Sequence, residues 1–113
     1  MVNLLQAAPC GIFSFNEEGI IVQVTPTLCE WVHRTPEELQ YQKLDMLLTL
    51  PSQIFYQTHF LPLLKMQHKA EEIFLTLKTK EDGEIPVLVS ARQAMDEGHM
   101  EYVCACIPIY HRK

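Results

Sequence analysis

Apolar and polar residues alternate most clearly over residues 72–80, where Ile73, Leu75 and Leu77 would share one face of a β-strand and Thr76 and Lys78 the other. Four further segments, 11–15, 20–25, 85–93 and 100–109, are rich in the β-branched and aromatic residues that favour strands. Turn signals that end in glycine separate the strands at residues 16–19, 81–83 and 96–98. The pattern therefore predicts five strands joined in part by three tight turns.

The segment between the second and third strands has a helical rhythm instead. The motif at residues 35–38, Thr-Pro-Glu-Glu, can cap a helix that begins at residue 36, because its side chains satisfy the free amides of the first turn. A shorter helical turn over residues 27–32 precedes it. Pro51 interrupts the apolar pattern, and Ser52 is expected to cap a further helix over residues 53–61.

The order of elements is two strands, several helices and three strands. Tight hairpins at both ends of the chain favour antiparallel pairing, and the central helices must bury their apolar side against one face of the resulting sheet. The sequence therefore predicts an α+β fold, a five-stranded antiparallel sheet with a helical connection packed over one face.

Composition and charge narrow the class of partner. Of 113 residues, 9 are Lys or Arg and 14 are Asp or Glu, and this net charge of −5 disfavours binding to nucleic acid. No apolar run reaches the roughly 18 residues that span a bilayer, and the N-terminus lacks the basic start of a signal peptide. We therefore expect a cytoplasmic domain without membrane insertion, whose four cysteines are reduced thiols.

Catalysis is not expected from this chain. An enzyme would need an activated nucleophile, paired carboxylates or a glycine-rich phosphate loop. The four glycines instead fall at strand starts or turns, and the acidic pairs fall at turns or at the starts of elements. We therefore predict a binding or signalling domain without catalytic residues.

Five short motifs follow one another along the chain in a specific order. They are Gly11-Ile12-Phe13 before Asn16-Glu17-Glu18-Gly19, Val24-Thr25-Pro26, Thr35-Pro36-Glu37-Glu38-Leu39, Lys80-Glu81-Asp82-Gly83 before Ile85-Pro86-Val87, and Met95-Asp96-Glu97-Gly98. Together they resemble a PAS domain over residues 8–109. Two positions depart from the family: Thr25 replaces a common asparagine, and Ile109-Tyr110-His111 replaces an Asp-x-Thr exit.

The resemblance implies a sensory module of a larger signalling protein. Residues 56–64, followed by Glu72-Ile73, look most like PAS modules of bacterial histidine kinases, as in two-component systems, and of sigma-factor-regulating phosphatases. It implies one PAS domain over residues 1–113, with residues 1–8 as a flanking segment and 110–113 as the start of a linker to a kinase or phosphatase effector. Such a module binds a small ligand or a partner and relays the change to its effector.

By the same resemblance, a ligand cavity would lie between the inner sheet face and the helical connection, suited to a small apolar ligand. Plain core packing is the alternative for such residues. The candidates for the cavity wall are Leu44, Leu47, Phe55, His59, Phe60, Ile73, Leu75, Leu77, Leu88, Ser90, Val103, Ala105 and Ile107.

The cofactor, if there is one, is left open by the sequence. Haem-binding relatives use a histidine on the helix that corresponds to the one carrying His59, and a neutral imidazole suits haem iron. A structural histidine is the alternative reading. Flavin is disfavoured, because Cys29 lies in an earlier element and outside the Asn-Cys-Arg motif of light-sensing relatives. No metal site is predicted otherwise.

A homodimer is predicted from unpartnered apolar residues. The last strand is apolar on both faces, so Tyr102, Cys104 and Cys106 would face outward if Val103 and its alternate neighbours face the core. With Leu4 and Leu5 of the N-terminal segment, these three residues would form an interface patch larger than a monomer usually exposes. A pure dimerisation module without ligand is therefore an alternative to a ligand sensor.

Overall fold

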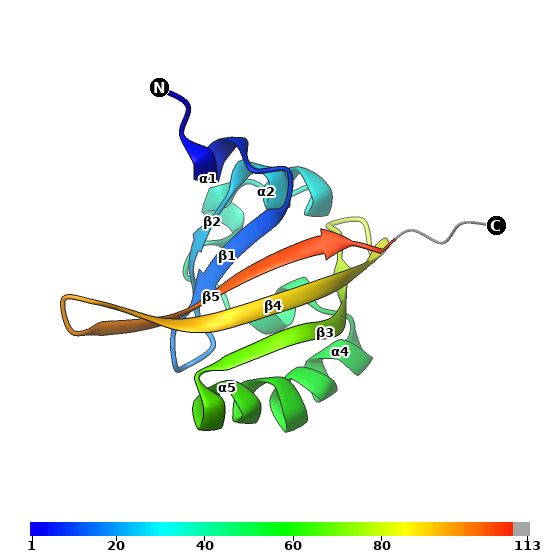
Figure 1. Cartoon of the computed structure of the whole chain (residues 1–113). Helices are drawn as coiled ribbons and strands as arrows, with labels where there is room; N and C mark the ends of the chain where they lie inside the picture. Colours follow the sequence, from blue (N-terminus) through cyan, green and yellow to red (C-terminus); the bar gives the residue numbers. More distant parts are fainter. Residues whose placement is uncertain (110–113) are drawn as a thin grey trace.

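The computed structural model describes residues 1–109 and contains a single five-stranded antiparallel sheet in the order β2-β1-β5-β4-β3 (Figure 1). The strands are β1 (Gly11–Phe15), β2 (Ile21–Val24), β3 (Lys69–Lys78), β4 (Glu84–Asp96) and β5 (His99–Pro108). All five predicted strands are confirmed within a few residues. The predicted linker at 110–113 and the predicted exit at Tyr110-His111 lie outside the described residues.

The helices precede the sheet or connect its two parts. They are α1 (Leu4–Ala7), α2 (Pro26–Val32), α3 (Pro36–Leu39), a 3-10 turn (Leu44–Leu47), α4 (Leu50–Phe55), a π-helical turn (Tyr56–Phe60) and α5 (Leu61–Gln67). The predicted start at residue 36 is confirmed. Thr35 accepts a hydrogen bond from the Glu38 amide, and the Glu38 carboxylate accepts one from the Thr35 amide.

The helical segment from residue 50 onward differs from the prediction at its start. Thr49, not Ser52, is the cap residue, and Pro51 lies within the first turn, where its missing amide proton costs nothing. The Ser52 hydroxyl instead accepts a hydrogen bond of 2.8 Å from the amide of Thr76 in β3. Ser52 therefore ties α4 to the edge of the sheet.

One face of the sheet, the inner face, packs on the helices and forms the core. From β1 and β5, Phe13, Phe15, Tyr102, Cys104 and Cys106 are all buried there. The predicted facing of β5 is therefore wrong: Tyr102, Cys104 and Cys106 point inward, and Val103, Ala105 and Ile107 point outward. Because β5 is apolar on both faces, its register with the aromatic residues of β1 decides which side is buried.

The hairpin formed by β4 and β5 extends beyond the other strands (Figure 1). The pairing of β5 with β1 ends at Tyr102, whereas the β4–β5 ladder continues to Asp96 and His99. Its turn has positive φ angles at Glu97 and Gly98, as the predicted glycine turn requires. Ala94 and Glu101 are paired with each other in this hairpin, just beyond the point where the pairing of β5 with β1 ends.

Candidate functional site

Several predicted cavity residues lie on the inner face, but they are packed into the core. Leu44, Leu47, Phe60, Leu75 and Leu77 are each at most 4% exposed. Ile73 is partly buried and packs against the same cluster. These residues therefore meet where the prediction placed them, as members of the hydrophobic core cluster.

The other sheet residues proposed for the cavity wall are wrong. Leu88, Ser90, Val103, Ala105 and Ile107 all lie on the outer face, because Val87, Val89 and the alternate residues of β5 fill the inner face. Side chains alternate between the two faces of a strand, so assigning one residue to the wrong face assigns every predicted residue of that strand to the wrong face. These residues belong to a surface and not to an internal wall.

His59 is exposed and does not point into the core. Its ring stacks on the ring of Phe55 with centroids 4.9 Å apart, and its Nδ1 lies 2.7 Å from the Thr58 hydroxyl. Phe55 is also exposed, because the π-helical turn leaves Tyr56 and Phe60 as the buried aromatic residues. The placement of His59 and Phe55 on the cavity wall is therefore wrong, and His59 lacks the position of an internal haem ligand.

Tyr56 carries the unusual polar group of the core. The residue is 2% exposed, and its hydroxyl has no hydrogen-bond partner among the described residues. It abuts the turn between β1 and β2, where a side-chain carbon at Gly19 would lie 3.0 Å from it. Burial, and then the nearby Asp45 carboxylate, raise the pKa of Tyr56. The hydroxyl is therefore a neutral donor that has no acceptor within residues 1–109.

The outer face carries an apolar ridge across three strands. Phe74 in β3, Leu88 in β4 and Ile107 in β5 are direct neighbours in the strand register. Phe74 is 69% exposed and Ile107 52% exposed. Cross-strand neighbours of this kind form one continuous surface. We call these three residues the outer ridge.

A hollow of about 290 Å³ lies beside the outer ridge. Its floor contains the small side chains of Ser90 and Ala105, which are paired across β4 and β5. Lys69 and Arg92 line the same hollow and are direct partners across β3 and β4, and Glu71 lines it as well. Like charges placed opposite each other are unfavourable, so the Lys69–Arg92 pair is an unusual feature of a chain of net charge −5.

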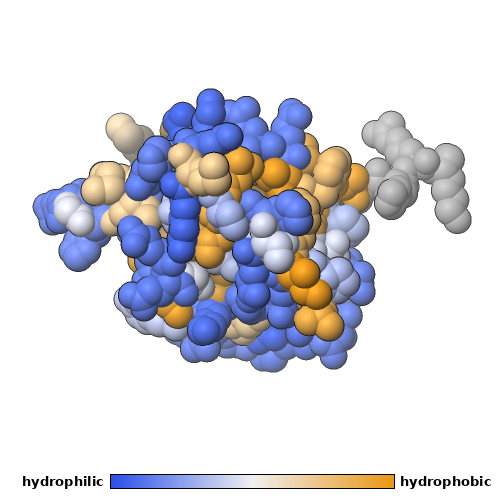
Figure 2. Space-filling model, turned by 90° about the horizontal axis from the view of Figure 1, so that it is seen from below, coloured by the Kyte–Doolittle hydropathy of each residue, from blue (hydrophilic) through white to orange (hydrophobic). Residues whose placement is uncertain are grey.

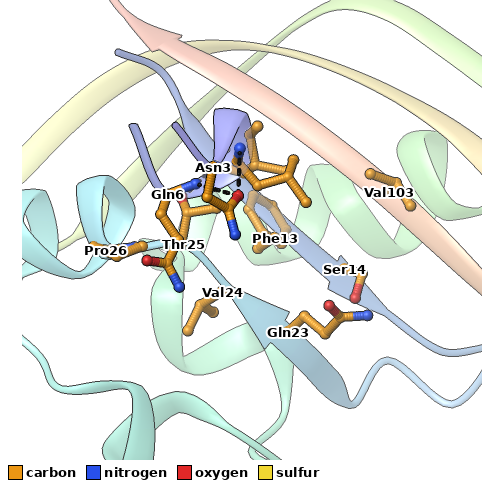
Figure 3. Close-up of a pocket in the computed structure, with 11 residues that line it drawn as sticks. Asn3, Gln6, Phe13, Ser14, Gln23, Val24, Thr25, Pro26 and Val103 are labelled. Atoms are coloured by element: carbon orange, nitrogen blue, oxygen red, sulfur yellow. Dashed lines mark hydrogen bonds between the residues drawn. The ribbon is translucent and has the colours of Figure 1, made fainter. Parts of the chain in front are cut away.

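A second hollow, of about 410 Å³, lies between α1 and the outer side of β1 and β2 (Figure 3). The side chains of Asn3 and Gln6 come from the α1 end, while Ser14, Gln23 and Val103 lie along the strands. Leu5 of α1 also lines it, and both Leu4 and Leu5 are exposed as the interface prediction requires. The hollow is open to solvent, and its walls are formed by α1 and by the sheet.

A carboxylate is held by two of the residues that line this second hollow. The Ser14 hydroxyl donates to Oε1 of Glu101 at 2.6 Å, and Nε2 of Gln23 donates to the same oxygen at 3.4 Å. Ser14 is 4% exposed, so this hydrogen bond fixes the position of the carboxylate. Sequence reasoning missed Glu101, although a polar residue beside the apolar run 102–107 was the available signal.

The buried thiols are poor nucleophiles. Burial, with a smaller effect from Cys10, raises the pKa of Cys106 to about 12, and burial also raises the pKa of Cys104 well above its ordinary range. All four cysteines are free thiols. Within residues 1–109, no group of three His, Cys, Asp or Glu side chains could hold a metal ion.

Exposed apolar residues also occur on the helical side of the molecule. Leu50, Ile54 and Met66 project from α4 and α5 and are all more than half exposed. In the view from below, the apolar areas are interrupted by hydrophilic surface (Figure 2). In the described part of the chain, no helix is long and apolar enough to cross a membrane.

Comparison with known proteins places this chain in one family. The family model described as PAS fold matches residues 1–109. The phosphoserine phosphatase RsbP of Bacillus subtilis (strain 168) is 41% identical over 108 residues, which are 96% of this chain and 27% of that protein. The chain therefore spans about a quarter of the length of this relative.

Solved structures agree at the level of the fold. A PAS domain from Colwellia psychrerythraea superposes with a TM-score of 0.83 at 11% identity and covers 94% of this chain and 91% of its own. A PAS domain of a two-component sensor histidine kinase superposes with a TM-score of 0.81 at 11% identity, covering 94% and 90%. The chain belongs to the PAS family.

Proposed function

We propose that this PAS domain is the association module of a longer signalling protein and that its outer sheet face binds a second copy of the chain. PAS domains are sensory units of signalling proteins and not catalytic ones. The observation that carries the proposal is the outer ridge, formed by Phe74, Leu88 and Ile107 in register. A row of exposed apolar side chains on a sheet face is typical of an interface.

The N-terminal segment supports association through the same face. Leu4 and Leu5 on α1 are exposed, and α1 borders the 410 Å³ hollow on the outer side of β1 and β2. The ridge runs from β3 to β5, and the hollow lies on the β1 and β2 side of β5. The apolar ridge and the hollow bordered by exposed leucines thus share one face, which two identical copies can bury together.

The effector is expected in the remainder of a longer chain. The matched relative is a phosphatase, and the match spans 27% of its length. We propose that a change in the outer face or in the core of this domain alters the spacing of two effector domains, either phosphatases or kinases. A cytoplasmic, bacterial signalling protein is the setting that this resemblance favours.

Light scattering on purified protein tests association through the outer face. We expect a dimer for the wild type and a monomer for Ile107→Glu, because a charge on the outer ridge would lose its hydration in the interface. Met66→Glu is the matched control, since Met66 is also an exposed apolar residue but lies on α5. A wild-type monomer at all concentrations would refute the proposal, as would a dimer that Ile107→Glu leaves intact.

A small ligand in the core is the second candidate function. It is favoured by the Tyr56 hydroxyl, which is buried and has no acceptor among the described residues. A small molecule with a hydrogen-bond acceptor would complete this group. Native mass spectrometry, with a visible spectrum to detect haem, tests it. Bound mass that Tyr56→Phe loses supports this function, and a clean, colourless protein contradicts it.

A further inference from the structure

The strand order makes β5 the central strand, with β1 and β2 on one side and β4 and β3 on the other. One row of outward residues crosses all five strands at a single level. In spatial order from β3 to β2, it consists of Lys69, Arg92, Val103, Ser14 and Gln23. Val103 lies at its centre.

One half of this row contains two basic residues, and the other half binds the carboxylate of Glu101, which lies on β5 two residues from Val103. Lys69 and Arg92 occupy the half on β3 and β4. In the half on β1 and β2, Ser14 and Gln23 both donate to the carboxylate of Glu101 and hold it over their own strands. The two basic residues and the two residues that bind this carboxylate therefore stand at the same level, one pair on each side of Val103.

A two-fold axis along β5 would superpose these halves. When two sheets meet face to face about such an axis, β4 of one copy lies over β1 of the other, and β3 lies over β2. The level along the strands does not change. Arg92 and Lys69 of one copy then meet the Glu101 carboxylate of the second copy, and the symmetry repeats the contact.

The ion pairs within one copy leave the side chains of Arg92 and Lys69 available to bind a partner. Arg92 makes no ion pair with any of residues 1–109, and Lys69 reaches only Glu71, at 3.9 Å between exposed side chains. An exposed pair of that geometry contributes little. A guanidinium group can bind both oxygens of a carboxylate, so a held carboxylate such as Glu101 suits Arg92.

The same axis also determines which residues face each other at the next level of the strands. The same axis lays Ser90 of β4 over Ile12 of β1 in the second copy, since both residues pair with Ala105 of β5. Ser90 and Ala105 form the floor of the 290 Å³ hollow, and Ile12 is a half-buried side chain on the opposite half of the face. Ile12, which also lines the 410 Å³ hollow, would therefore face the 290 Å³ hollow of the second copy.

We infer that two copies of this chain associate about a two-fold axis along β5 and that Arg92 of each copy pairs with Glu101 of the other. This inference rests on the proposed association through the outer face and specifies its geometry. Because rotation about β5 keeps the strand direction, both β5 strands end at Pro108 on the same side of the dimer. Two effector domains that follow the chain would then lie side by side.

A double-mutant cycle measured by sedimentation equilibrium tests the pairing. We expect Arg92→Glu and Glu101→Arg each to raise the dimer dissociation constant about tenfold or more, and the double variant to recover most of the loss. Lys65→Glu, the same charge change on α5, should leave association unchanged. A wild-type dimer whose two substitutions act additively would overturn the pairing while leaving the association intact, whereas a wild-type monomer would overturn both.

A cross-linking variant tests the axis if a charge reversal impairs folding. Val103→Cys should form a disulfide between copies under mild oxidation by diamide, because the axis passes beside this residue. Met66→Cys, an exposed position on α5 on the helical side, is the control. Cross-linking of Val103→Cys at no higher rate than Met66→Cys would overturn the inference.

Discussion

The aromatic rings of Phe15 and Tyr102 lie across the β1–β5 pair with their centroids 5.3 Å apart. This contact fixes the facing of β5, because every second residue on from Tyr102 then enters the core. The outward position of Val103 is its direct consequence. The boundary between the core and the outer face of this domain is therefore set by one aromatic pair.

Adjacent substitutions in β5 should differ sharply in their effect on stability. We expect Tyr102→Ala to lower the free energy of unfolding by about 3 to 5 kcal/mol, because it leaves a cavity beside Phe15. Val103→Ala should change it by no more than about 0.5 kcal/mol in dilute protein, since Val103 lies at the surface. Urea unfolding measures both. Equal losses would contradict the facing described above.

The Tyr56 hydroxyl should contribute nothing to the stability of the ligand-free domain. Tyr56→Phe removes a buried donor that has no acceptor in the described part of the chain, so the free energy of unfolding should stay unchanged or rise by about 1 kcal/mol. Tyr56→Leu is the comparison, because it also removes the ring that packs on Phe15 and Phe60. Thermal or urea unfolding decides. A clear loss in Tyr56→Phe would mean that the hydroxyl has an acceptor in the folded protein.

The carboxyl group of Glu38 should titrate below its ordinary range. A hydrogen bond from Lys80, and then one from the Thr35 amide, lower its pKa from 4.5. The stabilisation is present above pH 4.5 and is lost as the pH falls through the lower, folded pKa. Carbon-13 NMR titration should show this pKa rising in Lys80→Ala. An identical pKa in both proteins would contradict the Lys80 contact.

The cysteines should differ in reactivity in the folded state. At pH 8, iodoacetamide should modify the half-buried Cys10 before Cys104 and Cys106, whose burial raises their pKa. All four thiols should react in urea. The contribution of Cys106 to stability is present below its ordinary pKa of 9.0 and lost as the pH rises toward about 12. Equal labelling of Cys10 and Cys106 in the folded protein, followed by mass spectrometry, would contradict the burial.

Local patterns were sufficient to predict the strands and the capped helix. The alternation at residues 72–80 and the capping motif at Thr35 each depend on neighbours within a few positions. The facing of β5 depends on its pairing with β1, about 90 positions away in the chain, and an apolar strand carries no local sign of it. The cavity residues placed on β4 and β5 were therefore wrong together.

The candidate site was predictable only in its apolar parts. Leu4 and Leu5 stand out in the sequence because they are apolar residues of a short segment that precedes the first strand, and both are exposed in the structure. The charged residues of the outer face do not stand out in the sequence. Arg92 and Glu101 can be related to each other only when the pairing register of the strands is known. The exposed position of His59 likewise depends on the π-helical turn, which adds a residue to the helical period.

The most direct test of association through the outer face is methyl NMR of the wild-type domain at two concentrations. We expect the signals of Leu88, Val103 and Ile107 to shift with concentration, while those of Leu50 and Ile54 on α4 stay in place. Both sets are exposed or half-buried, so the comparison is internal to one sample. Spectra that do not change with concentration, or shifts confined to α4, would contradict the account.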